Sequence, residues 1–307
     1  MKDVDFNCPC AMAPMDQPSP PISLECLTLS DIQRLPLVDF PDRQASFYRL
    51  GNHHVIKVST SSMLRRQFST TRFAHDLLGL PQIPIMSQER IYERNGQEFF
   101  CVLMDLKPGI RLEDAWPVWD DRQRQSFWLS FLDICSAMSR QSNSYISSMN
   151  NGHVKDELFD TISGQPGPFA TEPEFIEAIS LALAERAFDD HRVPFTCRML
   201  ETIASLPRPA RDEPFTFTHG NLQGGHILVS DPSRTNRVEI TGILGWEQCG
   251  YYPAWWEISK IMLDNASGPE SEPTALVDGL TSYGWLKDWK VYAAEVSTMM
   301  HVWNYIF

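Results

Sequence analysis

Residues 215–229 read Phe-Thr-Phe-Thr-His-Gly-Asn-Leu-Gln-Gly-Gly-His-Ile-Leu-Val, and residues 240–247 read Ile-Thr-Gly-Ile-Leu-Gly-Trp-Glu. The short apolar runs in and around these stretches predict strands at 215–218, 226–229 and 238–244. A polar loop that contains a His-Gly-Asn segment connects the first strand to the second. The sequence therefore predicts a strand–loop–strand unit, followed by a third strand and a Gly-Trp-Glu segment.

The part of the chain that precedes this unit begins with strand signals. Residues 46–58 predict two strands around a Gly-Asn turn, and the apolar run at 99–104 predicts a buried strand. The spacing of Leu and Phe residues between them predicts a helix over 61–78. Short extended pieces are expected at 83–86 and 89–94.

Helix signals dominate the remainder of the chain. Apolar residues at helical spacing predict a helix over 121–140, and a capping box at 171–174 predicts the start of another helix. Further helices are expected over 196–205, 255–265 and 273–306. This order of elements indicates an α+β protein.

The composition is typical of a globular protein with an acidic surface. The 307 residues are 43% hydrophobic and 21% charged, and the formal net charge is −13. Nucleic acid is not an expected partner, because an acidic surface repels phosphates. We expect no membrane span and no signal peptide, since the chain lacks the apolar runs that either requires. The seven cysteines are dispersed rather than arranged as a disulfide framework, which favours a reducing, cytoplasmic location.

The two quoted stretches resemble the core motifs of the aminoglycoside phosphotransferase family, small-molecule kinases with a protein-kinase-like fold. That family's pattern reads His-Gly-Asp-Leu-x-x-x-Asn-Ile-Leu-Val and then Ile-x-Asp-Trp-Glu. The resemblance implies a two-lobed protein with a small β-rich N-lobe, a large helical C-lobe and a cleft between them. We expect a flexible tail over 1–22, an N-lobe over 23–106 and a C-lobe over 107–307. Cys8 and Cys10 lie in the tail, where we interpret them as incidental thiols rather than a metal site.

Five more segments resemble the pattern common in fungal members of the family. Residues 47–57 resemble the strand pair that ends in the nucleotide-binding lysine, which here is Lys57. Residues 103–109, which include Met104, resemble the hinge that meets adenine through its backbone. The other three segments are 112–116, 167–175 and 250–257.

The residues that carry phosphoryl transfer in the family are replaced in this chain. Asn221 stands where the resemblance implies the catalytic Asp, and a neutral amide cannot accept the proton. His226 and Gly245 stand where it implies two metal ligands, although magnesium prefers oxygen. Gln67 stands where it implies the Glu partner of the lysine. We therefore expect ordinary ATP-dependent kinase activity to be absent, with no bound metal and no cofactor.

The candidate site combines these loops with two residues of the expected N-lobe. The candidate catalytic residues are His226, Asn221 and His219, and the candidate substrate-binding residues are Gln223, Trp246, Glu247, Lys57 and Met104. Plainer interpretations stay open, with His219 structural, Trp246 in the core and Glu247 a surface carboxylate. Lys57 is interpreted as a solvated lysine unless it binds a phosphate. A zinc site made from the two histidines lacks a third ligand.

Three functions remain open for such a protein. The first is an ATP-independent enzyme of secondary metabolism that binds an apolar organic substrate in the cleft, such as a cyclase, an isomerase or a pericyclase of the Diels–Alder type. The second is a non-catalytic pseudokinase binding module, and the third is an atypical small-molecule phosphotransferase. We favour the first, because the remaining donors can polarise a carbonyl or move a proton. No feature of the sequence indicates an oligomeric state.

Overall fold

The structure, a computed structural model, describes residues 23–38, 45–159, 166–188, 214–231, 237–261 and 299. The chain divides into two compact units. The first consists of Met1–Phe68 and Ile85–Leu106, and the second of Ser69–Pro84 and Lys107–Phe307. The boundary between them falls within helix α2 (Met63–Leu78), which was predicted over 61–78. Residues 69–84 group with the second unit, whereas the predicted division placed them in the first lobe.

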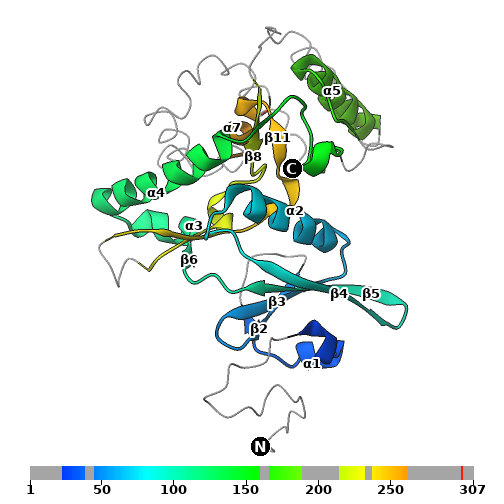
Figure 1. Ribbon diagram of the computed structural model, residues 1–307, viewed down its shortest axis with the longest axis vertical. Helices are drawn as coiled ribbons and strands as arrows, with labels where there is room; N and C mark the ends of the chain where they lie inside the picture. Colours follow the sequence, from blue (N-terminus) through cyan, green and yellow to red (C-terminus); the bar gives the residue numbers. More distant parts are fainter. Residues whose placement is uncertain are drawn as a thin grey trace, which may run out of the picture. The chain divides into compact units, whose positions relative to one another are not determined.

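The first unit is built on an antiparallel sheet whose five described strands follow the order β1-β2-β3-β5-β4. Strands β2, β3, β4 and β5 are labelled in Figure 1. The strands are β1 (Leu37–Val38), β2 (Ser46–Leu50), β3 (His54–Ser59), β4 (Met86–Arg94) and β5 (Gln97–Asp105). Strands β2 and β3 form the predicted hairpin, and the predicted buried strand is β5. Lys57 on β3 lies opposite Val102 on β5. Strand β4 is continuous from 86 to 94, where two separate extended pieces were expected.

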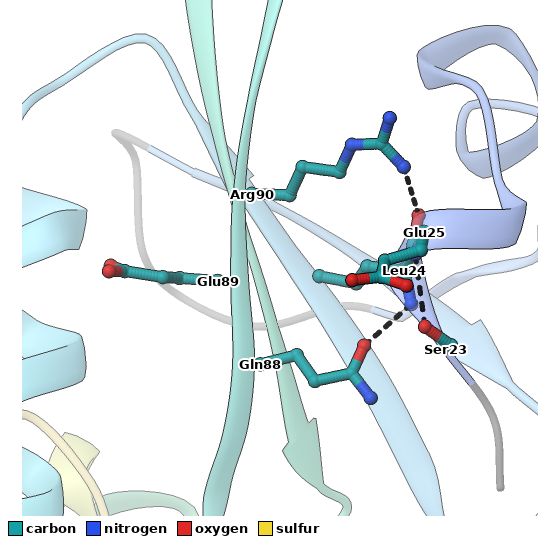
Figure 2. A pocket seen from close by; sticks show the side chains of 6 residues that line it. All are labelled: Ser23, Leu24, Glu25, Gln88, Glu89 and Arg90. Carbon is teal, nitrogen blue, oxygen red and sulfur yellow. Dashed lines mark hydrogen bonds between the residues drawn. The ribbon is translucent and has the colours of Figure 1, made fainter.

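An N-terminal segment, residues 23–32, packs on this sheet. It contains the 3₁₀ turn η2 (Leu24–Cys26) and the short helix α1 (Leu29–Ile32). The Gln88 side chain accepts the Leu24 amide at 2.6 Å, and Arg90 donates to the Leu24 carbonyl at 2.8 Å (Figure 2). Figure 2 shows Glu89 on the opposite side of β4, as the alternation of side chains along a strand requires. The pocket drawn there is lined by Ser23, Leu24, Glu25, Gln88, Glu89 and Arg90.

The described helices that lie wholly in the second unit are α3 (Leu112–Ala115), α4 (Asp121–Ser139), α5 (Glu172–Phe188) and α7 (Ala254–Ile261). Helix α4 begins with a capping box, in which Asp120 and Gln123 each accept the backbone amide of the other. The predicted capping box of α5 is only half formed. Thr171 accepts the Glu174 amide, but the Glu174 carboxylate accepts the amide of Ala170.

Two small sheets of the second unit position the quoted loops. Their strand orders, over the described residues, are β10-β9-β6 and β11-β8-β7. The strands are β6 (Ile110–Arg111), β7 (Ser142–Asn143), β8 (Phe215–Thr218), β9 (Ile227–Val229), β10 (Ile240–Ile243) and β11 (Gly250–Tyr252). The connection from β8 to β9 leads from one sheet to the other, and the connection from β10 to β11 leads back. The two loops therefore lie together, and His226 and Leu244 are joined by a backbone hydrogen bond of 2.8 Å.

The predicted strands of this region are confirmed, although His226 belongs to a 3₁₀ turn rather than to β9. The other 3₁₀ turns among the described residues are η3 (Trp116–Val118), η4 (Met149–Asn151), η5 (Glu157–Phe159), η6 (Gly224–His226) and η7 (Trp246–Gln248). The predicted helix over 196–205, the tail over 1–22 and nearly all of 273–306 lie outside the described residues. Among the helices that the structure describes, none is long and apolar enough to cross a membrane.

Candidate functional site

His219 is fully buried at the start of the loop that follows β8. Its Nε2 donates to the Leu244 carbonyl at 2.8 Å, and its Nδ1 accepts the Asn221 amide at 3.2 Å. Burial, reinforced by the neighbouring His226, lowers the pKa of His219 to about 3. The ring is therefore neutral at physiological pH, and each of its nitrogens is engaged by the backbone. These contacts support the structural interpretation of His219 over the predicted catalytic role.

His226 lies at the end of the same loop and is partly exposed. Its Nδ1 is 2.8 Å from the carbonyl oxygen of Asn221. Because a carbonyl oxygen can only accept, this bond places a proton on Nδ1, and the neutral ring then carries its lone pair on Nε2. Within the described part of the chain, no hydrogen bond engages Nε2. The loop thus presents a histidine with a fixed tautomer and an unoccupied basic nitrogen.

The backbone of Asn221 connects the two histidines. Its amide donates to His219, and its carbonyl accepts from His226. Its side chain is partly exposed and forms no hydrogen bond with any residue that the structure describes. The three predicted catalytic residues are therefore brought together, and the Asn221 side-chain amide is left with its donors unused.

Gly245 lies directly against the His226 ring. Its φ of 83° is in the left-handed region, and a Cβ at this position would lie 3.0 Å from three ring carbons of His226. The imidazole thus fills the space beside residue 245, where the resemblance implies a metal-binding carboxylate. Such a short contact could be relieved only by displacing the ring or the backbone.

The residues at the three replaced positions do not fit a magnesium ion. Asn221 offers an amide, His226 an imidazole whose Nδ1 is already bonded, and Gly245 no side chain. Magnesium prefers oxygen ligands in octahedral geometry and is usually held by carboxylates. Among the described residues, no group of three or more His, Cys, Asp and Glu side chains is placed to hold a metal.

Glu257 on α7 is fully buried beneath the loop. Its Oε2 accepts the Gly220 amide at 2.9 Å, and its Oε1 accepts the Leu222 amide at 3.2 Å. The two carboxylate oxygens therefore hold the backbone on both sides of Asn221. Burial raises the pKa of Glu257 to about 7, although the backbone hydrogen bonds and Lys260 act in the opposite direction.

Lys260, one turn further along α7, is also buried. Its Nζ lies 2.7 Å from Asp156 Oδ2 and donates to Gln248 Oε1 at 3.1 Å. The ammonium group also lies over the Trp256 ring, 5.6 Å from its centroid. Helix α7 thus places the Glu257 carboxyl group against the loop and the Lys260 ammonium group against Asp156.

The predicted substrate-binding residues of the second unit differ in their surroundings. Trp246 is fully buried, its Nε1 donates to the Ile243 carbonyl at 2.9 Å, and its ring stacks on Phe217. These contacts support the core interpretation of Trp246. Gln223 and Glu247 are partly exposed on the two loops, and their substrate-binding roles stay predictions.

Lys57 and Met104 belong to the first unit. The sequence suggested a solvated Lys57 side chain, but the structure buries it, since the residue is only 7% exposed. Its Nζ donates to Gln67 Oε1 at 2.6 Å and lies over the Phe47 ring. Met104 is buried on β5 opposite Val55. Substrate-binding roles for Lys57 and Met104 stay predictions.

The sequence analysis did not identify Glu257, Lys260 or Asp156 as parts of this site. A signal for the first two was present in α7, because an acid and a base stand three residues apart among large apolar residues. The apolar residues around them are Trp255, Trp256, Ile258 and Ile261. Charges inside such a helix are buried only when partners compensate them.

Comparison with known proteins supports the fold. Residues 159–294 match the sequence profile of the phosphotransferase enzyme family. No curated protein sequence matches the chain.

Solved aminoglycoside phosphotransferases have similar structures. A thermostable mutant of APH(4)-Ia, in a ternary complex with AMP-PNP and hygromycin B, is 12% identical with a TM-score of 0.59, and the match covers 87% of this chain and 82% of that chain. The apo form of a thermostable APH(4)-Ia mutant is 13% identical with a TM-score of 0.58, covering 89% and 85%. The GDP complex of wild-type aminoglycoside 2'-phosphotransferase-IIIa is 14% identical with a TM-score of 0.57, covering 88% and 85%. The predicted fold class and the resemblance drawn from the motifs are therefore confirmed.

Proposed function

We propose that this aminoglycoside-phosphotransferase-like protein is an ATP-independent enzyme that moves a proton on a small organic molecule. The reaction class is isomerisation, or ring closure through the same deprotonated intermediate. The substrate is a weakly charged, largely apolar carbonyl compound. Such a substrate suits loops that have lost the groups required for a magnesium-bound triphosphate.

One observation carries this proposal, namely the tautomer of His226. The Asn221 carbonyl 2.8 Å from Nδ1 leaves Nε2 as the basic nitrogen of a partly exposed ring. A histidine imidazole is the commonest general base in enzymes. The fixed ring orientation removes part of the entropic cost of aligning the base with its substrate.

The chemistry needs no co-reactant. His226 Nε2 takes a proton from the carbon next to a carbonyl, the electron pair of the C–H bond forms a carbon–carbon double bond, and the π pair of the carbonyl moves onto its oxygen. The Asn221 side-chain amide donates a hydrogen bond to the oxyanion that forms. Return of the proton to a different carbon completes an isomerisation. Attack by the enolate carbon on a second electrophilic carbon of the same molecule closes the ring, and His226 then returns its proton to the atom that has taken up the negative charge.

Phosphoryl transfer is not the function that these residues support. Asn221 cannot act as a base, and the His226 ring fills the space beside Gly245. Loss of a general base alone costs a typical enzyme about 10²- to 10⁴-fold in rate. Recovering transfer would therefore require several compensating groups at once.

Deuterium exchange tests the proposal without knowledge of the natural substrate. A panel of apolar ketones and enones with slow background exchange is incubated with the protein in D₂O, and mass spectrometry follows deuterium at carbon. We expect the protein to accelerate exchange in a subset of the panel, and His226→Gln to slow it by about 10²- to 10⁴-fold. His53→Gln, at an exposed turn of the first unit, is the matched control. Compounds that bind but never exchange would contradict proton transfer.

A nucleotide-binding module without turnover is the second candidate. It is supported by Lys57, which lies on β3, where the resemblance places the nucleotide-binding lysine. The Lys57 side chain is buried and donates a hydrogen bond to Gln67. A thermal shift with Mg·ATP, without loss of ATP and without exchange in the panel, is the result expected for such a module. Magnesium-dependent phosphorylation of any compound would overturn both candidates.

A further inference from the structure

Glu257 is placed to control the geometry of the candidate base from a distance. Its two carboxylate oxygens accept the amides of Gly220 and Leu222, at 2.9 and 3.2 Å. These residues flank Asn221, so the carboxylate restrains the peptide groups before and after it. In the described part of the chain, no other side chain forms hydrogen bonds with both amides.

The restrained backbone leads directly to His226. The Asn221 carbonyl can accept the Nδ1 proton of His226 only while the peptide keeps its present orientation. The opposite side of the loop is equally tight, because a Cβ at Gly220 would lie 2.6 Å from the Gln248 carbonyl oxygen. A shift of the Gly220–Leu222 backbone would therefore carry the Asn221 carbonyl away from the imidazole.

We propose that Glu257 is a positioning residue whose ionised carboxylate holds the Asn221 carbonyl against His226, and that protonation of Glu257 loosens this hold and frees the His226 tautomer. The chain of contacts runs from α7 through two backbone amides to one carbonyl and one imidazole. The inference that Glu257 thereby tunes catalysis rests on the proposed function of His226. The structural coupling between the two side chains is independent of that function, because it rests only on the hydrogen bonds of the loop.

The surroundings of Glu257 set the pH range of this coupling. Burial is the main cause that raises the pKa of Glu257 to about 7, so that its charge changes near neutrality. Lys260 on α7 is the cation that opposes this rise, and Lys260 is itself paired with Asp156. His219, on the loop above, is neutral because its pKa is about 3.

Three further titratable groups of the described residues interact with Glu257 and are uncharged at neutral pH. Burial raises the pKa of the Cys135 thiol on α4, of the Cys249 thiol after η7 and of the Tyr252 phenol on β11. A protonated carboxyl has one oxygen that carries a hydrogen, and this oxygen is a poorer acceptor for a backbone amide. Below neutrality one of the two loop bonds is therefore weakened.

NMR spectroscopy of the full-length, isotope-labelled protein tests the coupling directly. Between pH 5.5 and 9 we expect the Gly220 and Leu222 amide resonances to shift together, with a midpoint near the Glu257 value of about 7. The ring nitrogens of His226 should show the Nδ1–H tautomer at high pH. Glu257→Gln should abolish the shared shift and give a mixture of His226 tautomers. Exchange of both amides with solvent should become about tenfold faster, as expected for the loss of a bond to a charged group.

Two control variants make the result specific. Glu239→Gln applies the same chemical change to an exposed acid beside β10 and should leave every readout unchanged. His226→Gln removes the imidazole, so an amide shift that persists in it is due to Glu257 and not to the histidine. If Glu257→Gln does not fold, the titration of the unaltered protein and of His226→Gln decides the question.

The outcomes separate this inference from the proposed function. Absence of a shared amide titration, or an unchanged His226 tautomer in folded Glu257→Gln, would overturn the positioning role even if His226 catalyses exchange. Tautomer coupling without any deuterium exchange would uphold the role of Glu257 and remove its catalytic meaning. If both hold, Glu257→Gln should slow exchange by about 10²-fold, the loss that a small misplacement of a catalytic group causes.

Discussion

The His226 imidazole packs against Gly245 so closely that a Cβ on residue 245 would lie 3.0 Å from three of its ring carbons. The two residues come from different loops and stand at the positions where the resemblance implies two metal ligands. Each replacement accommodates the other, because the ring occupies space that only glycine leaves open. Reverting one of them therefore creates a steric conflict in addition to a change of chemistry.

We expect Gly245→Ala to lower the free energy of unfolding by about 2–4 kcal/mol, since left-handed strain adds to overpacking against His226. Gly79→Ala is the matched control, because Gly79 also has a positive φ but no atom within 4 Å of its Cβ position. It should lose only about 1–2 kcal/mol. Urea unfolding measures both. Equal losses in the two variants would show that the His226 ring yields without cost.

Gly245→Asp should not restore phosphoryl transfer. The added carboxylate meets the His226 ring, and neither a base at Asn221 nor a second oxygen ligand is supplied. Incubation with labelled ATP, magnesium and aminoglycosides should yield no phosphorylated product. Product formation by this single variant would refute the view that several groups were lost together.

His219 should make the protein sensitive to acid. Its pKa is about 3 in the folded state against an ordinary value of 6.5, so the unfolded chain binds more protons between these values. Stability supplied by His219 is therefore complete above pH 6.5 and is lost as the pH falls toward 3. His219→Gln should be less stable at pH 7, by about 1–3 kcal/mol for a buried group left unpaired. It should also show a weaker loss between pH 6.5 and 4, which urea unfolding at several pH values measures.

The contribution of Glu257 to stability should depend on pH in the opposite direction to that of His219. Its pKa is about 7 in the folded state against an ordinary 4.5, so between these values the folded protein holds the extra proton. The contribution of Glu257 to stability is greatest below pH 4.5 and falls as the pH rises to 7. Subtracting the unfolding free energy of Glu257→Gln from that of the unaltered protein should give a difference that declines over this range. A difference that rises instead would mean that the carboxylate is ionised well below neutrality.

The buried pair of Lys260 and Asp156 offers a test of partner dependence. Lys260→Met should cost about 3–5 kcal/mol, because it leaves the buried Asp156 carboxylate without its cation. Adding Asp156→Asn should recover part of that loss. Arg237→Met breaks an exposed pair with Glu239 and should cost less than about 1 kcal/mol. Additive effects of the first two changes, measured as a double-mutant cycle, would show that the pair is not coupled.

Local patterns were sufficient to predict the longer helices and strands that the structure describes. The hairpin of β2 and β3, the helices α2 and α4, and the strands around the His-Gly-Asn loop follow from apolar periodicity and turn residues. The replacements at Asn221, His226 and Gly245 were also visible, since motif spacing is a property of the chain itself. Errors arose where the exposure of a side chain depends on tertiary packing. The sequence suggested that Lys57 was solvated, but the structure buries it beside Gln67.

The amino-acid sequence by itself determined which groups this protein possesses and where its longer strands and helices lie. Only the tertiary structure decided that His226 fills the space beside Gly245 and that Glu257, more than thirty residues further along, binds the loop around Asn221. The physical reason is that periodicity and propensity act over a few neighbouring residues. A buried carboxylate and the amides it accepts are brought together only when distant elements pack.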